Sequence, residues 1–328
     1  MGDTLDRVTD SPDVTVVIPT RNRRAVLMKT LASALAQEDV GLEVVVVDDG
    51  SSDDTAASLG ALDDPRVRLV RRESTPGVAR ARNAGIAAAR GRWVAFLDDD
   101  DLWSPGKLRE QLAAASVTGA DFAYTAAVFV TPELEPIRVR AAPDPPDLLE
   151  RFPYVNPIPA GGSTVIARTA LLDRLEGFDE RLAQLADWDL WWRLVEAGTA
   201  AACDEPLVAY VQHPGSMLLT DRRDVLRERD YLDAKHRVSE EARRHPDRIW
   251  FWRWAAEGAV RAGRRGKAAN LFLRGALAHR SGLDVRLALS TIVRGTPQRS
   301  KDGREEDRGL ERTPEWLGRY RPPAAIAR

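Results

Sequence analysis

Hydrophobic and polar residues along the first hundred positions alternate between two periods. Short, continuous apolar runs are typical of strands that are covered on both faces. Between them lie segments in which apolar residues recur every three or four positions, as on one face of a helix. The predicted strands are Val14–Ile18, Glu43–Val47, Val67–Val70 and Trp93–Leu97, and the predicted helices are Ala25–Ala36 and Gly77–Arg90. This alternation predicts an α/β fold with a mostly parallel central sheet flanked by helices.

The pattern becomes mixed beyond residue 101. The predicted elements there are a helix over Pro105–Ala115, strands over Phe122–Val130 and Thr164–Ala167, and a helix over Asp187–Ala197. The segment Pro132–Pro159 holds eight prolines, which predicts an irregular excursion over the surface. Charged and aromatic helices follow after Thr220, and Trp250–Arg261 and Lys267–Ala278 are predicted to form a helical hairpin.

These changes in pattern divide the chain into four parts. Residues 1–12 are polar and are expected to be flexible. Residues 13–220 form the α/β domain, and residues 221–298 form a C-terminal helical appendage. Residues 299–328 are charged and contain prolines, so a flexible tail is expected there.

Charge is distributed unevenly along the 328 residues, although the formal net charge is only −2. Residues 221–328 hold 26 Lys and Arg against 16 Asp and Glu, a net charge of +10, and residues 1–220 carry −12. The single cysteine, Cys203, excludes a disulfide framework and a cysteine-rich metal site. No apolar run approaches the roughly 20 residues of a membrane-spanning helix, and the polar N-terminus does not resemble a secretory signal. We therefore expect a cytoplasmic protein. The basic part, residues 221–328, carries no recognised nucleic-acid-binding motif, so no nucleic-acid partner is expected.

Carboxylates directly follow two of the predicted strands. Asp48 and Asp49 come after Glu43–Val47, and Asp98–Asp101 come after Trp93–Leu97. In an open parallel sheet, ligands bind beyond the carboxyl ends of the strands. A single pair of aspartates would be typical of a solvated turn, but like charges gathered at buried strand ends need a cation. A divalent cation such as Mg²⁺, which takes one or two carboxylates and substrate phosphate oxygens, would meet that need.

Four sequence blocks carry a resemblance to a known family. They are VTVVIPTRNR, EVVVVDDGSSDDT, PGVARARNAGIAAARGRWVAFLDDDDLWSPGKL and GFDERLAQLADWDLWWRL. In this order and spacing they resemble the family-2 glycosyltransferases with the GT-A fold, over roughly residues 12–215. The resemblance implies a metal-dependent enzyme that takes a UDP-, GDP- or dTDP-sugar and inverts the configuration at the transferred carbon. Residues 13–101 would be its nucleotide-binding half, and residues 102–220 its acceptor-binding half.

The resemblance also implies which residues bind the nucleotide. They follow the predicted strands or lie in the helix Gly77–Arg90, and they are Pro19, Thr20, Arg21, Asn22, Asp49, Arg82, Asp98 and Asp99. Asp49 would bond the base, and Asp98 and Asp99 would contact the ribose. Arg80 is an alternative to Arg82 for the phosphates. The family commonly has Tyr where Arg21 stands, so a guanidinium contact would replace base stacking.

The resemblance implies a cofactor and a catalytic base as well. Asp100 would be the principal ligand of Mn²⁺ or Mg²⁺, with Asp98 and His213 as further candidate ligands. Asp187 falls where the family has its general base, which deprotonates the acceptor hydroxyl. The family usually has Glu where Ala186 stands, so Asp189 is an alternative base. On a helix these two aspartates would point to different faces, so only one should enter the site.

Small and aromatic residues in the second half are candidates for sugar contacts. Gly161, Gly162 and Ser163 could bring the backbone close to the donor sugar. Trp188 and Trp191 could form an apolar platform for an acceptor, although consecutive helical tryptophans often include a core residue. The aromatic and basic helix Trp250–Arg261 has three interpretations: a peripheral contact with the inner face of the membrane, an oligomer interface, or a helical cap on the catalytic domain.

These features favour a glycosyltransferase that moves a single sugar to a hydroxyl acceptor. The chain lacks the Gln-x-x-Arg-Trp segment of the family's processive synthases. The acceptor could be a glycan, a lipid-linked glycan or a natural product. A sugar nucleotidyltransferase should show a glycine-rich phosphate loop after the first strand, and PTRNR contains no glycine. A non-catalytic binding module would be expected to have lost the aspartates, and only Ala186 favours it.

Overall fold

Continuous runs of buried β-branched residues form the parallel half of the central sheet. The computed structural model describes residues 11–73, 75–213, 225–294 and 314–321. In the parallel half the strand order is β3-β2-β1-β4. The strands are β1 (Val14–Thr20), β2 (Leu42–Asp48), β3 (Val67–Arg71) and β4 (Trp93–Phe96). Every residue of β1, β2 and β4 is buried, as expected for strands covered on both faces.

The other half of the sheet is mixed, which differs from the mostly parallel sheet that the sequence predicts. Its strands are β5 (Leu102–Trp103), β6 (Phe122–Val130), β7 (Pro136–Arg140), β8 (Ile166–Arg168) and β9 (Ala200–Val211). β8 lies antiparallel between β4 and β6, β9 runs parallel to β6, and β5 lies antiparallel to β9. β7 lies inside the proline-rich segment and pairs antiparallel with β6, which precedes that segment, to form a hairpin.

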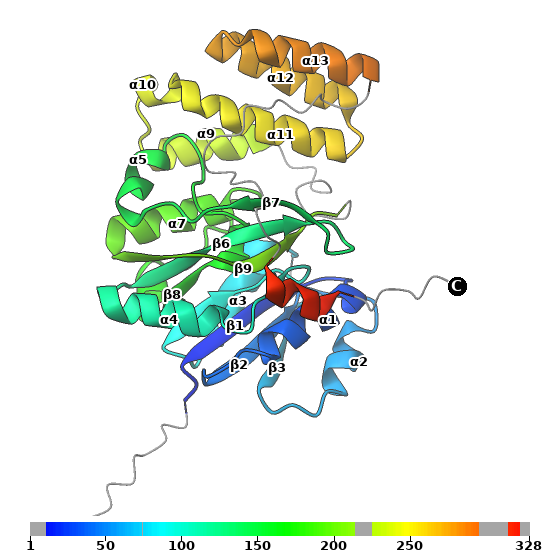
Figure 1. Cartoon of the computed structure of the whole chain (residues 1–328), viewed down its shortest axis with the longest axis vertical. Coiled ribbons are helices and arrows are strands. Elements are labelled where there is room, and N and C mark those ends of the chain that lie inside the picture. The colour runs from blue at the N-terminus through cyan, green and yellow to red at the C-terminus, as the bar shows by residue number, and fades with distance from the viewer. Residues whose placement is uncertain (1–10, 74, 214–224, 295–313, 322–328) are drawn as a thin grey trace, which may run out of the picture.

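Helices cover both faces of this sheet (Figure 1). One face packs against α1 (Arg24–Leu35), α2 (Thr55–Gly60) and α4 (Lys107–Thr118). The opposite face packs against α3 (Val78–Ala87), α6 (Thr169–Arg174) and α7 (Ala186–Ala197). Short helices complete the connections, namely η1 (Pro145–Asp147), α5 (Leu148–Arg151) and η2 (Gly161–Thr164).

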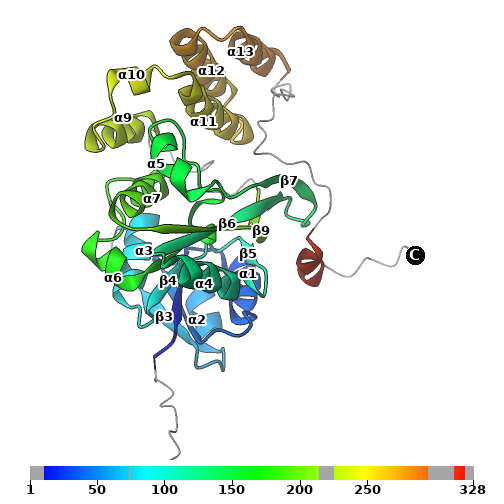
Figure 2. The ribbon, with the colours of Figure 1, turned by 60° about the vertical axis from the view of Figure 1, so that its left-hand side comes forward.

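The C-terminal helices extend the core on the α3, α6 and α7 side of the sheet (Figure 2). They are α9 (Val225–Lys235), α10 (Glu240–Arg243), η3 (Pro246–Arg248), α11 (Ile249–Arg261), α12 (Arg265–His279) and α13 (Gly282–Arg294). In this part α12 packs on α11, and α13 packs on α12. The predicted hairpin corresponds to α11 and α12. None of the helices in the described ranges combines the length and the apolarity that crossing a bilayer requires.

A short helix near the C-terminus differs from the flexible tail predicted for residues 299–328. η4 (Glu315–Tyr320) packs on the sheet domain with Leu317 fully buried. The Trp316 indole donates a hydrogen bond to the Pro206 carbonyl at 3.0 Å, and the Tyr320 hydroxyl donates one to the Trp103 carbonyl at 3.0 Å. Three apolar side chains within five residues therefore outweigh the charged composition of this segment. The predicted flexible N-terminus lies, for residues 1–10, outside the described residues.

The close approach of α3 to β1 requires a glycine at position 85. A Cβ atom added there would overlap the side chain of Val17 on β1. Gly266 in the first turn of α12 has open space at the same position. A comparison of alanine substitutions at these two glycines therefore distinguishes the effect of helix propensity from the effect of packing.

We expect Gly85→Ala to lower the free energy of unfolding by about 1–3 kcal/mol, because overpacking outweighs the gain in helix propensity. Gly266→Ala should leave it unchanged or raise it by up to about 1 kcal/mol. Urea unfolding followed by circular dichroism measures both values. Equal stabilisation by the two substitutions would contradict the packing argument.

Candidate active site

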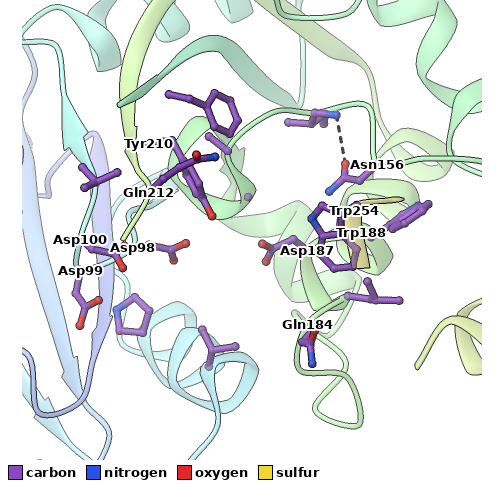
Figure 3. Close-up of a pocket in the computed structure, with 18 of the residues that line it drawn as sticks. Asp98, Asp99, Asp100, Asn156, Gln184, Asp187, Trp188, Tyr210, Gln212 and Trp254 are labelled. Carbon is purple, nitrogen blue, oxygen red and sulfur yellow. Dashed lines mark hydrogen bonds between the residues drawn. The ribbon is translucent and has the colours of Figure 1, made fainter. Parts of the chain in front are cut away.

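A cavity of about 740 Å³ opens at the carboxyl ends of β1, β2 and β4. Its other walls come from β7, β9, the start of α7 and the helix α11 (Figure 3). The site therefore lies where an open α/β sheet places its ligands, and it extends from the sheet to the C-terminal helices.

The end of the cavity near β1 and β2 contains most of the predicted nucleotide residues. Pro19, Thr20 and Arg21 line it. Asp49 also lines it and accepts a hydrogen bond from the Gly77 backbone N–H at 2.7 Å, in addition to its ion pair with Arg72.

Asn22 lies beside this end of the cavity but is absent from its lining. The residue has a left-handed backbone, with φ of 55°. Its side-chain oxygen accepts a hydrogen bond from the Ser52 backbone N–H at 2.7 Å. Asn22 therefore joins the loops that follow β1 and β2.

Asp99 and Asp100 follow β4, and both form ion pairs with the Arg23 guanidinium. Arg23 lies 3.1 Å from Asp99 and 2.6 Å from Asp100. The Thr20 hydroxyl donates to Asp99 at 2.6 Å. Burial, together with the charge of Asp100, raises the pKa of Asp99 to about 6.

His213 completes the surroundings of Asp100. Its Nε2 lies 2.7 Å from the Asp100 carboxylate. Burial disfavours ionisation of Asp100, but the hydrogen bond to His213 and the charge of Arg23 outweigh it and hold its pKa below the usual value. Asp100 is therefore an ionised carboxylate with an imidazole beside it.

Asp101 lies behind the cavity and supports its floor. It is fully buried and accepts hydrogen bonds from the Ser163 hydroxyl at 2.6 Å and from the Val211 backbone N–H at 3.0 Å. Burial, with the charges of Asp100 and Asp98, holds its pKa well above the usual value. Ser163 thus contacts Asp101 and does not line the cavity, in contrast to the predicted sugar contact.

Arg82 bridges the two carboxylates that face each other across the cavity. Its guanidinium lies 2.5 Å from Asp98 and forms a second ion pair with Asp187. Figure 3 shows the carboxylates of Asp98 and Asp187 pointing toward one another. Burial disfavours the charge on Arg82, but the two aspartates outweigh it and raise its pKa. Burial raises the pKa of Asp187, and the charge of Arg82 opposes that rise.

The other predicted arginine, Arg80, lies outside the cavity. It forms an ion pair with Glu180 at 3.1 Å, and its side chain is partly exposed. Of the two alternatives, only Arg82 faces the site.

The glycines of η2 leave room for this bridge. Gly161 has φ of +55°, and a Cβ there would come within 3.0 Å of an Asp187 carboxylate oxygen. A Cβ on Gly162 would lie 2.9 Å from the Arg82 guanidinium. Gly161 lines the cavity, whereas Gly162 is buried behind it against Arg82.

Asp189 points away from the cavity. It is fully buried, pairs with Arg193 at 2.7 Å and with Lys235 at 2.8 Å, and bonds to His236 at 3.0 Å. Burial disfavours ionisation, but the His236 hydrogen bond and the charge of Arg193 hold its pKa below the usual value. Since Lys235 and His236 belong to the C-terminal part, Asp189 fastens α9 and the residue after it to α7, and Asp187 alone enters the site.

The two predicted platform tryptophans have different positions. Trp188 lines the cavity and donates its indole hydrogen bond to the Phe152 carbonyl at 3.0 Å. Trp191 is fully buried against Phe96 and Phe178, so its prediction as an acceptor contact is wrong. Residues three apart share one side of a helix, so it is the packing of Phe96 and Phe178 over Trp191 that separates the two tryptophans.

Sequence reasoning did not identify several residues that line the cavity. They are Arg23, Phe129, Arg138, Arg140, Asn156, Gln184, Tyr210, Gln212 and Trp254. The order of residues after β1 could have identified Arg23, because it belongs to the same strand-end loop as Arg21. The others come from β6, β7, β9, α11 and connecting loops, which meet only in the folded chain. The aromatic residues of α11 that suggested a membrane contact, Trp250 and Trp254, lie in the cavity wall.

No three His, Cys, Asp or Glu side chains converge on one point as a ready-made metal cluster within the described ranges. Asp98 and Asp100 line the cavity, and the His213 imidazole lies outside the lining with its Nε2 2.7 Å from Asp100.

Comparison with known proteins identifies the class of this domain. Residues 15–174 match the model of Glycosyl transferase family 2. The succinoglycan biosynthesis protein ExoO of Rhizobium meliloti is 49% identical over 119 residues, which are 36% of this chain and 33% of that protein. The Escherichia coli protein WfaP, named as a UDP-Glc:alpha-D-GlcNAc-diphosphoundecaprenol beta-1,3-glucosyltransferase, is 25% identical over 69% of this chain and 89% of its own. The chain therefore covers only about a third of the length of ExoO.

Solved structures give the same fold. Crystalline Staphylococcus aureus TarS 1-349 in complex with UDP-GlcNAc superposes with a TM-score of 0.52 at 16% identity, over 88% of this chain and 93% of that chain. This likeness shows a GT-A fold with a C-terminal helical appendage. Residues 15–174 of the chain are thus similar in sequence to glycosyl transferase family 2, and the fold agrees with that similarity.

We expect Asp189→Asn to lower the free energy of unfolding by about 2–4 kcal/mol at neutral pH, because it leaves buried cationic groups without a counter-charge. The Asp189 pKa is lowered by folding, so its contribution is complete above the unfolded pKa of about 4 and is lost as the pH falls further. The two proteins should therefore converge in stability in acid. Urea unfolding at pH 7 and pH 3 measures this, and a difference that grows in acid would contradict it.

Proposed function

We propose that this protein transfers a single sugar from a nucleotide-sugar donor to a hydroxyl acceptor. The observation that carries the proposal is the single cavity in which Asp98–Asp100 and Asp187 occupy opposite walls, joined through Arg82. The match of residues 15–174 to the model of glycosyl transferase family 2 supports it. The acidic strand ends would hold the donor, and Asp187 would face the acceptor.

The donor end suits a nucleoside diphosphate. Asp49 provides a carboxylate beside the Gly77 N–H, and Arg21 lines the same wall. TarS is described in complex with UDP-GlcNAc, and WfaP is named for UDP-Glc, so a UDP-sugar is the first donor to test. We propose that Pro19, Thr20 and Asp49 surround the base and that Asp98 and Asp99 contact the ribose.

The residues present fit a divalent cation. Asp100 is ionised and lies 2.7 Å from the His213 imidazole, which gives one oxygen and one nitrogen ligand at the edge of the nucleotide end. Mg²⁺ and Mn²⁺ take few protein ligands when phosphate oxygens complete the shell. We propose that Asp100 and His213, with Asp98, hold such an ion, which would neutralise charge on the leaving diphosphate.

Asp187 is the proposed general base. It lies at the start of α7, facing Asp98 across the cavity, so it can accept a proton from a hydroxyl on the side opposite the departing nucleotide. Attack from that side inverts the configuration at the sugar carbon. Burial raises the pKa of Asp187 above the usual carboxyl value, which makes it a stronger proton acceptor, and the charge of Arg82 limits that rise.

The acceptor is a hydroxyl on a glycan, a lipid-linked glycan or a natural product. Trp188 and Trp254 line the cavity beside Asp187 and offer apolar faces for a sugar ring (Figure 3). The α11 wall, which contains Trp254, narrows the site on the acceptor side and favours addition of one sugar.

We expect UDP to raise the thermal midpoint in the presence of Mn²⁺ and to do so much less with EDTA, since the ion joins the diphosphate to Asp100. Asp100→Asn should weaken UDP binding in Mn²⁺ at least tenfold. Glu110→Gln, on an exposed face of α4, serves as the control and should not change it. Calorimetry measures the affinities, and metal-independent UDP binding of unchanged strength would refute the metal assignment.

We expect Asp187→Asn to reduce sugar transfer at least 10³-fold while UDP affinity in Mn²⁺ changes by less than about threefold, because general-base catalysis contributes about 10²–10⁴-fold. Release of UDP from a panel of UDP-sugars and acceptor glycosides measures transfer. Asp189→Asn is the matched control and should keep its turnover per folded molecule. Unchanged turnover of the Asp187 variant would remove the residue from the mechanism.

We also propose that α12 and α13 form a peripheral contact with anionic membrane. Apolar side chains protrude from both helices, with Leu277 82% exposed and Leu289 and Ile292 each 58% exposed. The same helices, with the residue that follows α12, carry the basic residues Arg265, Lys267, Arg274, Arg280 and Arg286. The one acidic residue of the two helices, Asp284, is buried in an ion pair with Arg253. Exposed aliphatic side chains on helices that also carry arginines suit the headgroup region of a bilayer.

We expect Leu277→Asp/Leu289→Asp to weaken sedimentation with phosphatidylglycerol-containing vesicles at least tenfold, because two aliphatic contacts are lost and negative charge is gained. Val117→Asp, at an 87% exposed site on α4, is the control. A protein that dimerises through this face without vesicles, and loses the dimer in the double variant, would identify an oligomer interface instead.

A further inference from the structure

The cavity changes sign from one end to the other. The end at the strands contains the carboxylates of Asp49, Asp98–Asp100 and Asp187. Four arginines line the cavity from two other elements, Arg138 and Arg140 of β7 and Arg253 and Arg261 of α11, with Glu257 as the one acidic residue that these two elements add to the lining in the described part of the chain. The proposed donor and metal account for the acidic end only.

The hairpin register directs two arginines to one side of β7. Arg138 and Arg140 are two residues apart, so their side chains leave the same face of the strand. Arg138 pairs with Phe129 of β6, and its guanidinium lies 4.6 Å from the centre of the Phe129 ring. Both arginines make other contacts as well, so what matters is where their charges lie.

The helix α11 provides the facing wall. Trp250, Trp254, Glu257 and Arg261 recur at three- and four-residue intervals and line the cavity from one helical face. Arg253 is held by two hydrogen bonds to Asp284, at 2.9 and 3.1 Å, and is therefore neutralised. Arg261 lies 4.0 Å from Glu257 and remains next to the cavity.

Tyr210 connects the two ends of the cavity. Its ring packs against Phe129 at 4.9 Å, and Figure 3 shows its hydroxyl directed toward Asp98. The charges of Asp98, Asp100 and Arg261 all act on this buried hydroxyl. The arginine end therefore begins within electrostatic reach of the proposed reaction centre.

We infer that Arg138, Arg140 and Arg261 bind a phosphate group of the acceptor, carried as a phosphate ester or a diphosphate. This inference rests on the proposed function, because it assigns the acceptor to the side of Asp187 away from the nucleotide. Guanidinium groups match the oxygens of a phosphate with paired hydrogen bonds. Arg138 and Arg140 leave one face of β7, so two guanidinium groups can approach the same phosphate from one wall of the cavity. Trp254 and Trp188 would contact the sugar between the phosphate and the attacking hydroxyl.

The test uses the full chain with its donor end filled by UDP and Mn²⁺. Hexyl phosphate is titrated into this complex by calorimetry, and hexyl β-glucoside serves as the uncharged comparison. We expect Arg138→Gln/Arg140→Gln to weaken hexyl phosphate binding at least tenfold and to leave UDP affinity unchanged. Arg138→Lys/Arg140→Lys keeps the charge and should restore part of the binding. Arg92→Gln/Arg244→Gln removes two exposed arginines outside the cavity and should change nothing.

Two further titrations identify the source of the phosphate. Glucose 1-phosphate represents a free sugar phosphate, and citronellyl diphosphate represents a lipid-linked acceptor. If either compound binds more tightly than hexyl phosphate, and this binding is lost in Arg138→Gln/Arg140→Gln, the result supports the inference and identifies the source of the phosphate.

Three outcomes would overturn the inference. The first is that the UDP-loaded protein binds none of the phosphates, and the second is that Arg138→Gln/Arg140→Gln binds hexyl phosphate as tightly as the control variant does. The third is that Arg138→Gln/Arg140→Gln loses UDP affinity to the same extent, which would assign these arginines to the donor. Failure of the wild type to bind UDP would instead refute the proposed function, and the acceptor role of the arginines with it. Thermal midpoints of all variants verify that each is folded.

Discussion

The cavity depends above all on the ion bridge through Arg82. This arginine comes from α3 and joins Asp98, beyond β4, to Asp187 at the start of α7, so one buried guanidinium holds three elements. Two carboxylates facing each other in a buried site would repel, and an arginine between them removes that repulsion. Phe178 lies under the guanidinium at 5.1 Å and keeps water from one side of it. The bridge thus holds the wall that contains Asp98 at a fixed distance from the wall that contains Asp187.

A second set of charges attaches the helical appendage. Asp179 and Asp189 of the sheet domain pair with Lys235 of α9, at 2.9 and 2.8 Å. The Glu228 carboxylate of α9 accepts hydrogen bonds from three successive backbone N–H groups, those of residues 183–185, just before α7. The acidic first part of the chain and its basic second part are therefore complementary at this contact. Because α11 belongs to the appendage and lines the cavity, this attachment also determines the position of that wall.

The sequence predicts the parallel half of the fold well, because β1, β2 and β4 are short buried runs whose hydrophobicity is continuous. It predicts the antiparallel half poorly. β7 lies in a segment with eight prolines, and the hairpin with β6 that stabilises it is a tertiary pairing without a local signal. The long strand β9 carries charged and half-exposed residues, so its hydrophobic pattern is interrupted.

The candidate site divides in the same way. Asp49, Asp98–Asp100 and Asp187 could be predicted because they stand at strand ends or in family blocks. Tyr210, Arg138 and Trp254 could not, since three distant segments bring them together. The choice between Asp187 and Asp189 needed the fold, because only the position of α9 shows which side of α7 is covered.

The helix η4 joins the far end of the chain to the floor of the cavity. The Tyr320 hydroxyl bonds to the carbonyl of Trp103, the Trp103 indole donates to the Ser163 carbonyl at 2.9 Å, and the Ser163 hydroxyl holds Asp101. A boundary for a shortened protein chosen from composition alone would fall near residue 298, before this helix. Such a protein would keep every proposed catalytic group and lose the brace behind them.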